Sequence, residues 1–250
     1  MQTIRLERGE WSFDESEPLG PAGGFGEVFR GSGPAGTVAV KRLKLSAGAA
    51  SHREMKIGAA LADRTLEHVV PILDFGQDAE SDRYFLVMPL CDYSLQDRLR
   101  REATLDQGSA RETALAILAG LEEASDIVHR DLKPGNILWH EGRWKIADFG
   151  IAKFVEDATS LESLRTSLTP SYAAPEQWRG ERPTSATDIY ALGCIFHAMI
   201  TGQPPFVGDA DAVREAHLHS PAPSLSGIDS RLAGLVTTML RKPPASRPSV

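Results

Sequence analysis

Two short segments near the middle of the chain carry residue types suited to phosphoryl transfer. They are residues 129–136 (HRDLKPGN) and residues 148–150 (DFG). Transfer of a phosphoryl group to a hydroxyl needs a carboxylate beside the attacking oxygen, oxygen ligands for Mg²⁺ and cations that neutralise the phosphates. An isolated aspartate in a loop is more often an ordinary solvated carboxylate, so the prediction depends on both segments occurring in this order. The candidate groups are Asp131, Lys133, Asn136 and Asp148.

A lysine earlier in the chain is a second candidate cation. Lys41 lies in the apolar segment Thr37–Leu43 (TVAVKRL), where a charge is costly to bury without a partner. Glu54 shares a predicted helical face with Ile57 and Leu61, so we expect it to face the sheet and pair with Lys41. Residues 51–54 (SHRE) also fit a capping box, in which the glutamate bonds to its own helix, and this alternative stays open.

A glycine-rich segment precedes Lys41. In residues 19–28 (LGPAGGFGEV) the glycines could let backbone amides approach phosphate groups without an intervening Cβ atom. Gly20 comes one residue earlier than a G-x-G-x-x-G spacing requires, and Pro21, which stands in that position, has no amide to offer. We expect a functional loop with a distorted first turn, although an ordinary hairpin turn would give a similar pattern.

The elements that must position these groups change in kind along the chain. Residues 1–90 alternate β-rich runs with Gly and Pro, which predicts a small antiparallel sheet. After residues 89–92 the pattern becomes helical, which predicts a second lobe and an α+β protein. The predicted strands are Trp11–Leu19, Glu27–Arg30, Thr37–Leu43, Val69–Leu73, Tyr84–Met88, Ile137–Trp139 and Lys145–Ala147, and the predicted helices are Ser51–Leu61, Leu95–Arg101, Gly108–Ala124 and Thr187–Thr201.

Composition excludes several classes of protein. The formal net charge of −7 disfavours a nucleic-acid partner, because phosphate backbones are bound by clustered Lys and Arg. The two cysteines, Cys91 and Cys194, lack a disulfide framework or metal-ligand spacing, which indicates a reduced, intracellular protein. The first ten residues lack the apolar core of a secretory signal, and the apolar run Ile189–Ile200 is too short to span a bilayer. We therefore expect a cytoplasmic location and no membrane contact by this segment.

Taken in order, these segments resemble the eukaryotic-type protein kinase family, from about Trp11 to the last residue. Residues 169–177 (TPSYAAPEQ) and the short loops are similar to the bacterial serine/threonine branch. The resemblance implies one two-lobed kinase domain over residues 1–250, with a five-stranded antiparallel sheet and one helix in a small lobe at about 10–88. A hinge at 89–92 and a larger, mainly helical lobe at about 93–250 would follow. The chain stops before the family's usual last helix, so the natural protein is expected to continue, for instance into a membrane anchor.

The resemblance also implies a role for each candidate residue. Asp131 would orient and deprotonate the substrate hydroxyl, and Lys133 would neutralise the γ-phosphate. Asn136 and Asp148 would hold Mg²⁺, which Mn²⁺ could replace, and Lys41 with Glu54 would grip the α- and β-phosphates of ATP. The remaining nucleotide contacts would come from Gly20, Gly23, Gly24, Phe25 and Gly26 in the loop, from Val28, Ala39 and Leu138 around the adenine, and from Met88, Pro89 and Cys91 at the hinge.

Three structural pairs are implied as well. Thr169 would bond near Asp131 and Lys133, and Asp188 would bond the backbone at residues 129–130. Glu176 would form a buried salt bridge with Arg247, although Arg247 could instead be a surface charge near the end of the chain.

The implied activity is transfer of the γ-phosphate of Mg·ATP to Ser and Thr hydroxyls of protein substrates. Lys133, two residues after Asp131, is typical of serine/threonine kinases. Autophosphorylation within Thr159–Ser167 is expected, with Arg130 and Lys153 receiving the phosphate and self-association allowing transfer in trans.

Alternative functions stay open. An inactive kinase fold that serves as a binding scaffold is the main alternative, and a small-molecule phosphotransferase is less favoured. A Walker-type NTPase is disfavoured because the sequence contains no G-x-x-x-x-G-K-[ST].

Overall fold

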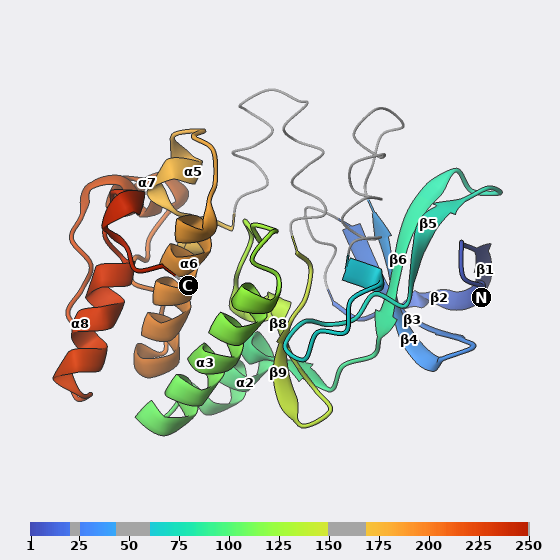
Figure 1. Cartoon of the computed structure of the whole chain (residues 1–250), viewed down its shortest axis with the longest axis horizontal. Coiled ribbons are helices and arrows are strands. Elements are labelled where there is room, and N and C mark those ends of the chain that lie inside the picture. Colours follow the sequence, from blue (N-terminus) through green and yellow to red (C-terminus); the bar gives the residue numbers. More distant parts are fainter. Residues whose placement is uncertain (21–25, 44–60, 150–168, 250) are drawn as a thin grey trace. The chain divides into compact units, whose positions relative to one another are not determined.

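The structure is a computed structural model that describes residues 1–20, 26–43, 61–149 and 169–249. Its backbone contacts divide the chain into two compact units (Figure 1). The first unit contains Met1–Asp92, and the second contains Tyr93–Gly150 together with Leu168–Val250. Each unit is described below by itself.

The first unit is built on an antiparallel sheet with the strand order β1-β2-β3-β4-β6-β5. The α+β class expected from the sequence is confirmed, but the sheet has six strands and not the predicted five. The additional strand is β1, in which Ile4 is the buried residue, so its sequence lacks a clear alternation of apolar and polar side chains. The strands are β1 (Gln2–Arg5), β2 (Glu10–Pro18), β3 (Gly26–Gly33), β4 (Gly36–Leu43), β5 (Asp74–Asp78) and β6 (Arg83–Pro89).

The predicted strand Val69–Leu73 is wrong, because the segment that pairs with β6 is β5, immediately downstream. Val69, Val70 and Ile72 are buried, which accounts for the apolar run that suggested a strand. Pro71 interrupts the run and cannot donate a ladder hydrogen bond, so Val69 forms only an isolated bridge and the continuous ladder with β6 lies after the proline. The predicted helix between Ser51 and Leu61 falls outside the described residues except for Leu61.

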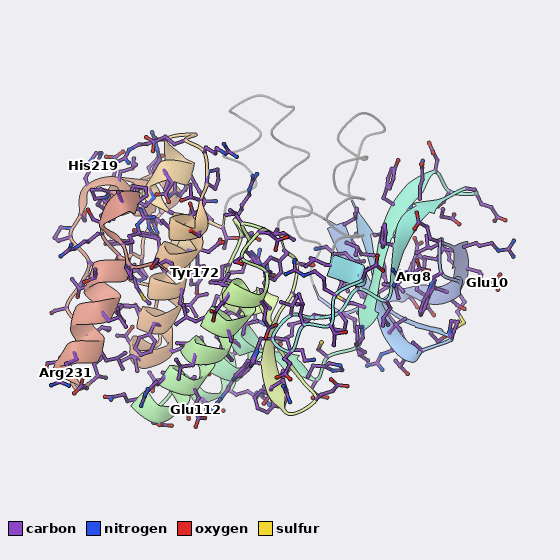
Figure 2. The ribbon with its side chains drawn as sticks, viewed as in Figure 1. Arg8, Glu10, Glu112, Tyr172, His219 and Arg231 are labelled. Atoms are coloured by element: carbon purple, nitrogen blue, oxygen red, sulfur yellow. The ribbon has the colours of Figure 1, made fainter. Side chains whose placement is uncertain are left out.

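Two aspartates of β5 tie the N-terminal segment to the far edge of the sheet. The amide of Arg8 donates to both carboxylate oxygens of Asp74 at 3.1 Å, and the indole of Trp11 donates to the same carboxylate at 2.7 Å. The amide of Arg5 donates to Asp78 at 3.1 Å. Figure 2 labels Arg8 in this region. The sheet therefore closes around an aromatic and aliphatic core formed by Ile4, Leu6, Trp11, Phe13, Phe29, Val38, Val40, Phe85 and Val87.

The second unit is mainly helical and carries a small three-stranded sheet of order β7-β8-β9. Four of its described helices begin at a side-chain cap: Ser94 caps α2, Asp106 caps α3, Asp209 caps α7 and Asp229 caps α8. The elements are β7 (Tyr93–Ser94), α2 (Leu95–Glu102), α3 (Gln107–Glu123), η1 (Pro134–Asn136), β8 (Ile137–His140), β9 (Arg143–Ile146), η3 (Pro170–Tyr172), α5 (Pro175–Trp178), α6 (Ser185–Thr201), α7 (Ala210–His219), α8 (Ser230–Met239) and η4 (Pro244–Ser246).

Helix α6 is the central helix of the second unit. Every residue from Thr187 to Met199 is buried, which confirms that the apolar run in this part of the sequence is a core helix. The helix ends at Gly202, whose φ of 79° lies in the left-handed region that glycine adopts without strain. Among the described residues, no helix combines the length and apolar character needed to cross a bilayer.

Candidate active site

The carboxylate of Asp131 is the centre of a polar cluster in the second unit. Only 8% of the residue is exposed, so its oxygens need partners. Lys133 donates from Nζ to Oδ2 at 2.7 Å, and Thr169 donates from Oγ1 to Oδ1 at 2.9 Å. Nζ of Lys133 also lies 3.2 Å from Oγ1 of Thr169, which confirms the expected contacts of that threonine with both residues. A carboxylate and an ammonium group, two of the groups that phosphoryl transfer needs, are thus held together, and the hydroxyl of Thr169 contacts both.

The backbone before Asp131 is held by the buried side chain of Asp188, on α6. Its two carboxylate oxygens accept from the amides of His129 and Arg130, each at 2.8 Å, as the sequence predicted. Burial raises the pKa of Asp188 above its ordinary range, although His129 and the two amide donors oppose this shift. Arg130 has a φ of 70°, a conformation that non-glycine residues rarely adopt, so this loop depends on such bonds.

The imidazole of His129 connects the two chemical segments of the sequence. His129 is fully buried, and its Nε2 lies 2.9 Å from the carbonyl oxygen of Ala147 while its Nδ1 accepts from the amide of Asp131 at 3.2 Å. These contacts fit the neutral tautomer that carries its proton on Nε2. The ring also packs 4.9 Å from that of Phe149, between centroids. The residues that precede Asp131 and Asp148 are thereby fixed to each other.

The small sheet brings the two candidate metal ligands to adjacent strand ends. Ile137 pairs with Ile146 in β8 and β9, and the amide of Ala147 donates to the carbonyl of Asn136 at 2.8 Å. Asp148 follows directly, with a φ of 59°. The Nδ2 group of Asn136 donates to the carbonyl oxygen of Asp131 at 2.9 Å. The side-chain oxygen of Asn136 is not used in this bond, so it can serve as a candidate metal ligand.

This donor set fits a small divalent cation. A carboxylate and an amide oxygen are hard ligands of the kind that Mg²⁺ takes, with water and phosphate oxygens completing its shell. In the described part of the chain there is no group of three or more His, Cys, Asp and Glu side chains that could hold a metal by themselves.

Several candidate nucleotide-binding residues of the first unit lie on strands β3, β4 and β6. Lys41 is 7% exposed and pairs with Val28 on β3 and Leu86 on β6, while Ala39 pairs with Met88. The strand positions of these residues therefore agree with those expected from the sequence.

Gly26 and the hinge show further local constraints. An added Cβ atom at Gly26, where φ is 151°, would overlap the carbonyl oxygen of Arg42, so strand pairing alone requires glycine there. At the predicted hinge, the thiol of Cys91 lies 3.7 Å from the carbonyl oxygen of Pro89.

Several predicted residues fall outside the described part of the chain. The choice between the Lys41 pair and the capping box for Glu54 therefore stays a prediction, as do the phosphate loop and the phosphorylation segment. The residues concerned are Pro21, Gly23, Gly24, Phe25, Glu54, Lys153 and Thr159–Ser167.

A buried ion pair anchors the segment that follows Thr169. Arg247 donates from its two terminal nitrogens to the two oxygens of Glu176 at 2.7 and 2.8 Å, and both side chains are almost fully buried. Burial raises the pKa of Glu176, but the bonds and charge of Arg247 outweigh it, so the pKa lies below its ordinary value. Thr187 also donates to this carboxylate, at 2.8 Å. The predicted salt bridge is confirmed, and the surface-charge alternative for Arg247 is wrong.

Sequence reasoning gave no structural role to Gln177, although this residue contacts the catalytic loop directly. Its Nε2 group donates to the carbonyl oxygen of Arg130 at 2.8 Å. The available signal was its position three residues after Ala174, at the start of a short helix, where a glutamine commonly bonds back to the first turn.

Comparison with known proteins agrees with this site. Residues 13–250 match the family described as "Protein kinase domain". The DNA damage-responsive serine/threonine-protein kinase RqkA of Deinococcus radiodurans is 36% identical over 187 residues, which cover 72% of this chain and 28% of that protein. The serine/threonine-protein kinase PkaB of Streptomyces coelicolor is 33% identical over 250 residues, which cover 90% of this chain and 57% of that protein.

A third relative has the same character. The probable serine/threonine-protein kinase PknB of Bifidobacterium longum is 36% identical over 173 residues, covering 64% of this chain and 25% of that protein. The chain thus spans about a quarter of the length of two of these relatives and somewhat more than half of the third. The chain belongs to the protein kinase domain family and is similar to its bacterial serine/threonine kinases.

Proposed function

We propose that this chain transfers the γ-phosphoryl group of ATP to serine or threonine hydroxyls of protein substrates. The observation that carries the proposal is the buried Asp131 carboxylate, bonded to Lys133 on one oxygen and to Thr169 on the other. Burying a charge is costly without compensating bonds, and buried, bonded carboxylates are enriched at functional sites. The family membership of the chain supports the same conclusion.

Each member of the cluster has a distinct proposed role. Asp131 orients the substrate hydroxyl and accepts its proton as the new bond to phosphorus forms. Lys133 stabilises the charge on the transferred group. Thr169 holds the carboxylate of Asp131 and the ammonium group of Lys133 in place through its hydrogen bonds with both. Asp188 and His129 fix the backbone from which Asp131 projects.

ATP and a divalent cation are the proposed cofactors. Asn136 and Asp148 would hold the cation, which neutralises phosphate charge when it is bound. We propose Mg²⁺ as the cation, with Mn²⁺ able to replace it. Lys41, with Glu54, would bind the α- and β-phosphates, and the adenine would contact Val28, Ala39, Leu138 and the hinge residues Met88, Pro89 and Cys91, while Gly20, Gly23, Gly24, Phe25 and Gly26 form the phosphate loop.

We further propose that residues 1–250 act as one kinase domain with its hinge at 89–92. Autophosphorylation within Thr159–Ser167, through self-association, would regulate it. A cytoplasmic location, either free or tethered to a membrane through the rest of a longer protein, is part of the same proposal. Intact-mass measurement after incubation with Mg·ATP tests the autophosphorylation, because each phosphate adds a fixed mass. Mass measurement of the proteolytic peptides then locates the phosphate, and no added phosphate between Thr159 and Thr169 would contradict the proposal.

The test of the activity is transfer of labelled phosphate to a generic basic protein by the wild type and by Asp131→Asn. The substitution keeps the size of the side chain but removes the proton acceptor and the charge beside Lys133. We expect clear labelling of Ser and Thr by the wild type and a loss of about a thousandfold in the variant. Equal labelling by the two proteins would refute the proposal. If the wild type binds nucleotide but labels no substrate, the alternative of an inactive kinase fold that serves as a binding scaffold would be favoured.

A further inference from the structure

The peptide bond that precedes Asp131 is hydrogen-bonded at both of its polar atoms by side chains. Its carbonyl oxygen, which belongs to Arg130, accepts from Nε2 of Gln177 at 2.8 Å. Its amide, which belongs to Asp131, donates to Nδ1 of His129 at 3.2 Å. A peptide plane has one donor and one acceptor, so these two contacts fix its rotation and with it the direction of the next side chain.

This peptide plane follows a residue with an unfavourable backbone conformation. Arg130 has a positive φ, which L-residues adopt only when the surroundings compensate for the strain. The bonds of Asp188 hold the amides of His129 and Arg130 on the near side of this residue. Gln177 supplies the corresponding restraint on the far side, at the peptide that leads directly into Asp131.

The orientation of the Gln177 amide follows from its two contacts. Oε1 accepts from the amide of Ala174 at 3.0 Å, while Nε2 faces the Arg130 carbonyl. A flipped amide would place donor against donor and acceptor against acceptor, so only one orientation satisfies both neighbours. An ionised glutamate could make only the contact with Ala174, and methionine could make neither.

Helix α5, which carries Gln177, is anchored by the residues on either side of Gln177. The preceding residue, Glu176, is held by the buried pair with Arg247, and the following residue, Trp178, is buried. Gln177 therefore connects an anchored helix to the catalytic loop, and the same helix follows closely after Thr169.

We propose that Gln177 is a positioning residue for Asp131, acting through the Arg130–Asp131 peptide. This inference rests on the proposed kinase activity for its catalytic consequence. Its structural part, the restraint on the peptide, does not depend on activity. The donor group of the side chain is the functional part, whereas the contact with Ala174 stabilises α5.

The experiment compares Gln177→Met and Gln177→Glu with the wild type. Gln203→Met serves as the matched control, because Gln203 is an exposed glutamine in the same unit. Steady-state phosphate transfer gives kcat and the KM for ATP, thermal unfolding gives the folded fraction, and amide hydrogen exchange reports on the segment around residues 128–132. For Gln177→Met we expect kcat to fall about tenfold with little change in KM, and faster exchange in this segment but not in α6. Gln203→Met should match the wild type in each measurement.

The pH dependence of kcat in Gln177→Glu tests the donor group, because a purely structural role of Gln177 predicts no such dependence. The ionised carboxylate cannot donate to the Arg130 carbonyl, but the protonated carboxyl can. We expect kcat of this variant, relative to the wild type at the same pH, to rise as the pH falls from 8 toward about 5.5. The ratio for Gln177→Met should stay flat over this range.

The outcomes separate this inference from the proposed function. An active wild type whose Gln177→Met variant keeps the kcat of the Gln203→Met control would overturn the positioning role. A flat pH ratio for Gln177→Glu would overturn the role of the donor group. A wild type without kinase activity would refute the proposed function and the catalytic consequence. In that case, unchanged hydrogen exchange in Gln177→Met would overturn the restraint on the peptide as well.

Discussion

Acid should destabilise the second unit through one buried histidine, His217, on α7. This residue is fully buried, packs edge-on against Phe206 at 4.9 Å between ring centroids, and places Nδ1 2.9 Å from the hydroxyl of Tyr190. Within the described residues its Nε2 atom makes no hydrogen bond of good geometry, and the nearby backbone of Ser171 opposes the lowering of the pKa of His217 only weakly. Lys242 donates to the same Tyr190 hydroxyl at 3.4 Å. Lys242 thus donates to Tyr190 and Tyr190 to His217, a chain that suits only the neutral imidazole.

Burial first, and then the positive charge of Lys242, lower the pKa of His217 from the ordinary value of 6.5 to about 3. Lys242 has a pKa lowered to about 8, so it stays protonated throughout the acidic range. Below pH 6.5 the unfolded state takes up a proton that the folded state refuses, so stability is present above this pH and is lost as the pH falls toward 3. The linkage relation gives a loss of about 2 kcal/mol between pH 7 and pH 5 from this group.

Urea unfolding at pH 7 and pH 5 measures this loss, and His217→Gln is the informative variant. The substitution lowers stability at both pH values because it disturbs packing, but it removes the titrating group. We therefore expect the decrease between the two pH values to be smaller by about 2 kcal/mol in His217→Gln than in the wild type. His219→Gln is the control, since this histidine lies on the outside at the end of the same helix (Figure 2). Equal pH dependence in the wild type and His217→Gln would refute the reasoning.

Other substitutions test the remaining structural arguments. Arg247→Met should lower the unfolding free energy by about 3–5 kcal/mol, because it leaves the Glu176 carboxylate buried without its partner, and the double variant with Glu176→Gln should lose less; denaturant titration would show whether it does. Asp74→Ala should cost about 2–3 kcal/mol by calorimetry, since it removes the acceptor for donors of the N-terminal segment; an unchanged melting temperature would argue against that closure. Gly26→Ala should destabilise β3, because the new methyl group would overlap the Arg42 carbonyl oxygen. Amide hydrogen exchange in β3 should then be faster in the variant than in the wild type.

The sequence was most informative where chemistry requires particular residue types. Asp131, Lys133 and Thr169 could be grouped because each type has a defined role in a phosphoryl-transfer motif, and the structure places them within hydrogen-bond distance. The pair of Glu176 and Arg247 was implied by the family resemblance, and not by the chemistry of the two residue types.

Elements held by tertiary contacts were harder to predict. Strand β1 has little β pattern of its own; it is held by its pairing with β2 and by the bonds of residues 5 and 8 to Asp78 and Asp74. The strand prediction at Val69–Leu73 was wrong for a related reason, because an apolar run shows burial and does not distinguish it from ladder pairing.

Gln177 illustrates a third kind of residue, whose importance depends on what it contacts and not on its own chemistry. An amide side chain has no charge to identify it and no reactive atom, so its type alone points to no function. Its role follows only when the fold brings α5 beside the loop that carries Asp131, about 46 residues earlier in the chain. Asp188 reaches the same loop from α6, and its two bonds hold only the amides that precede Asp131. The carbonyl on the other side of Arg130 needs a donor, and a carboxylate could not supply one. The loop is thus held by an acidic residue on one side and an amide on the other, so a position beside a well-known motif can affect how that motif works.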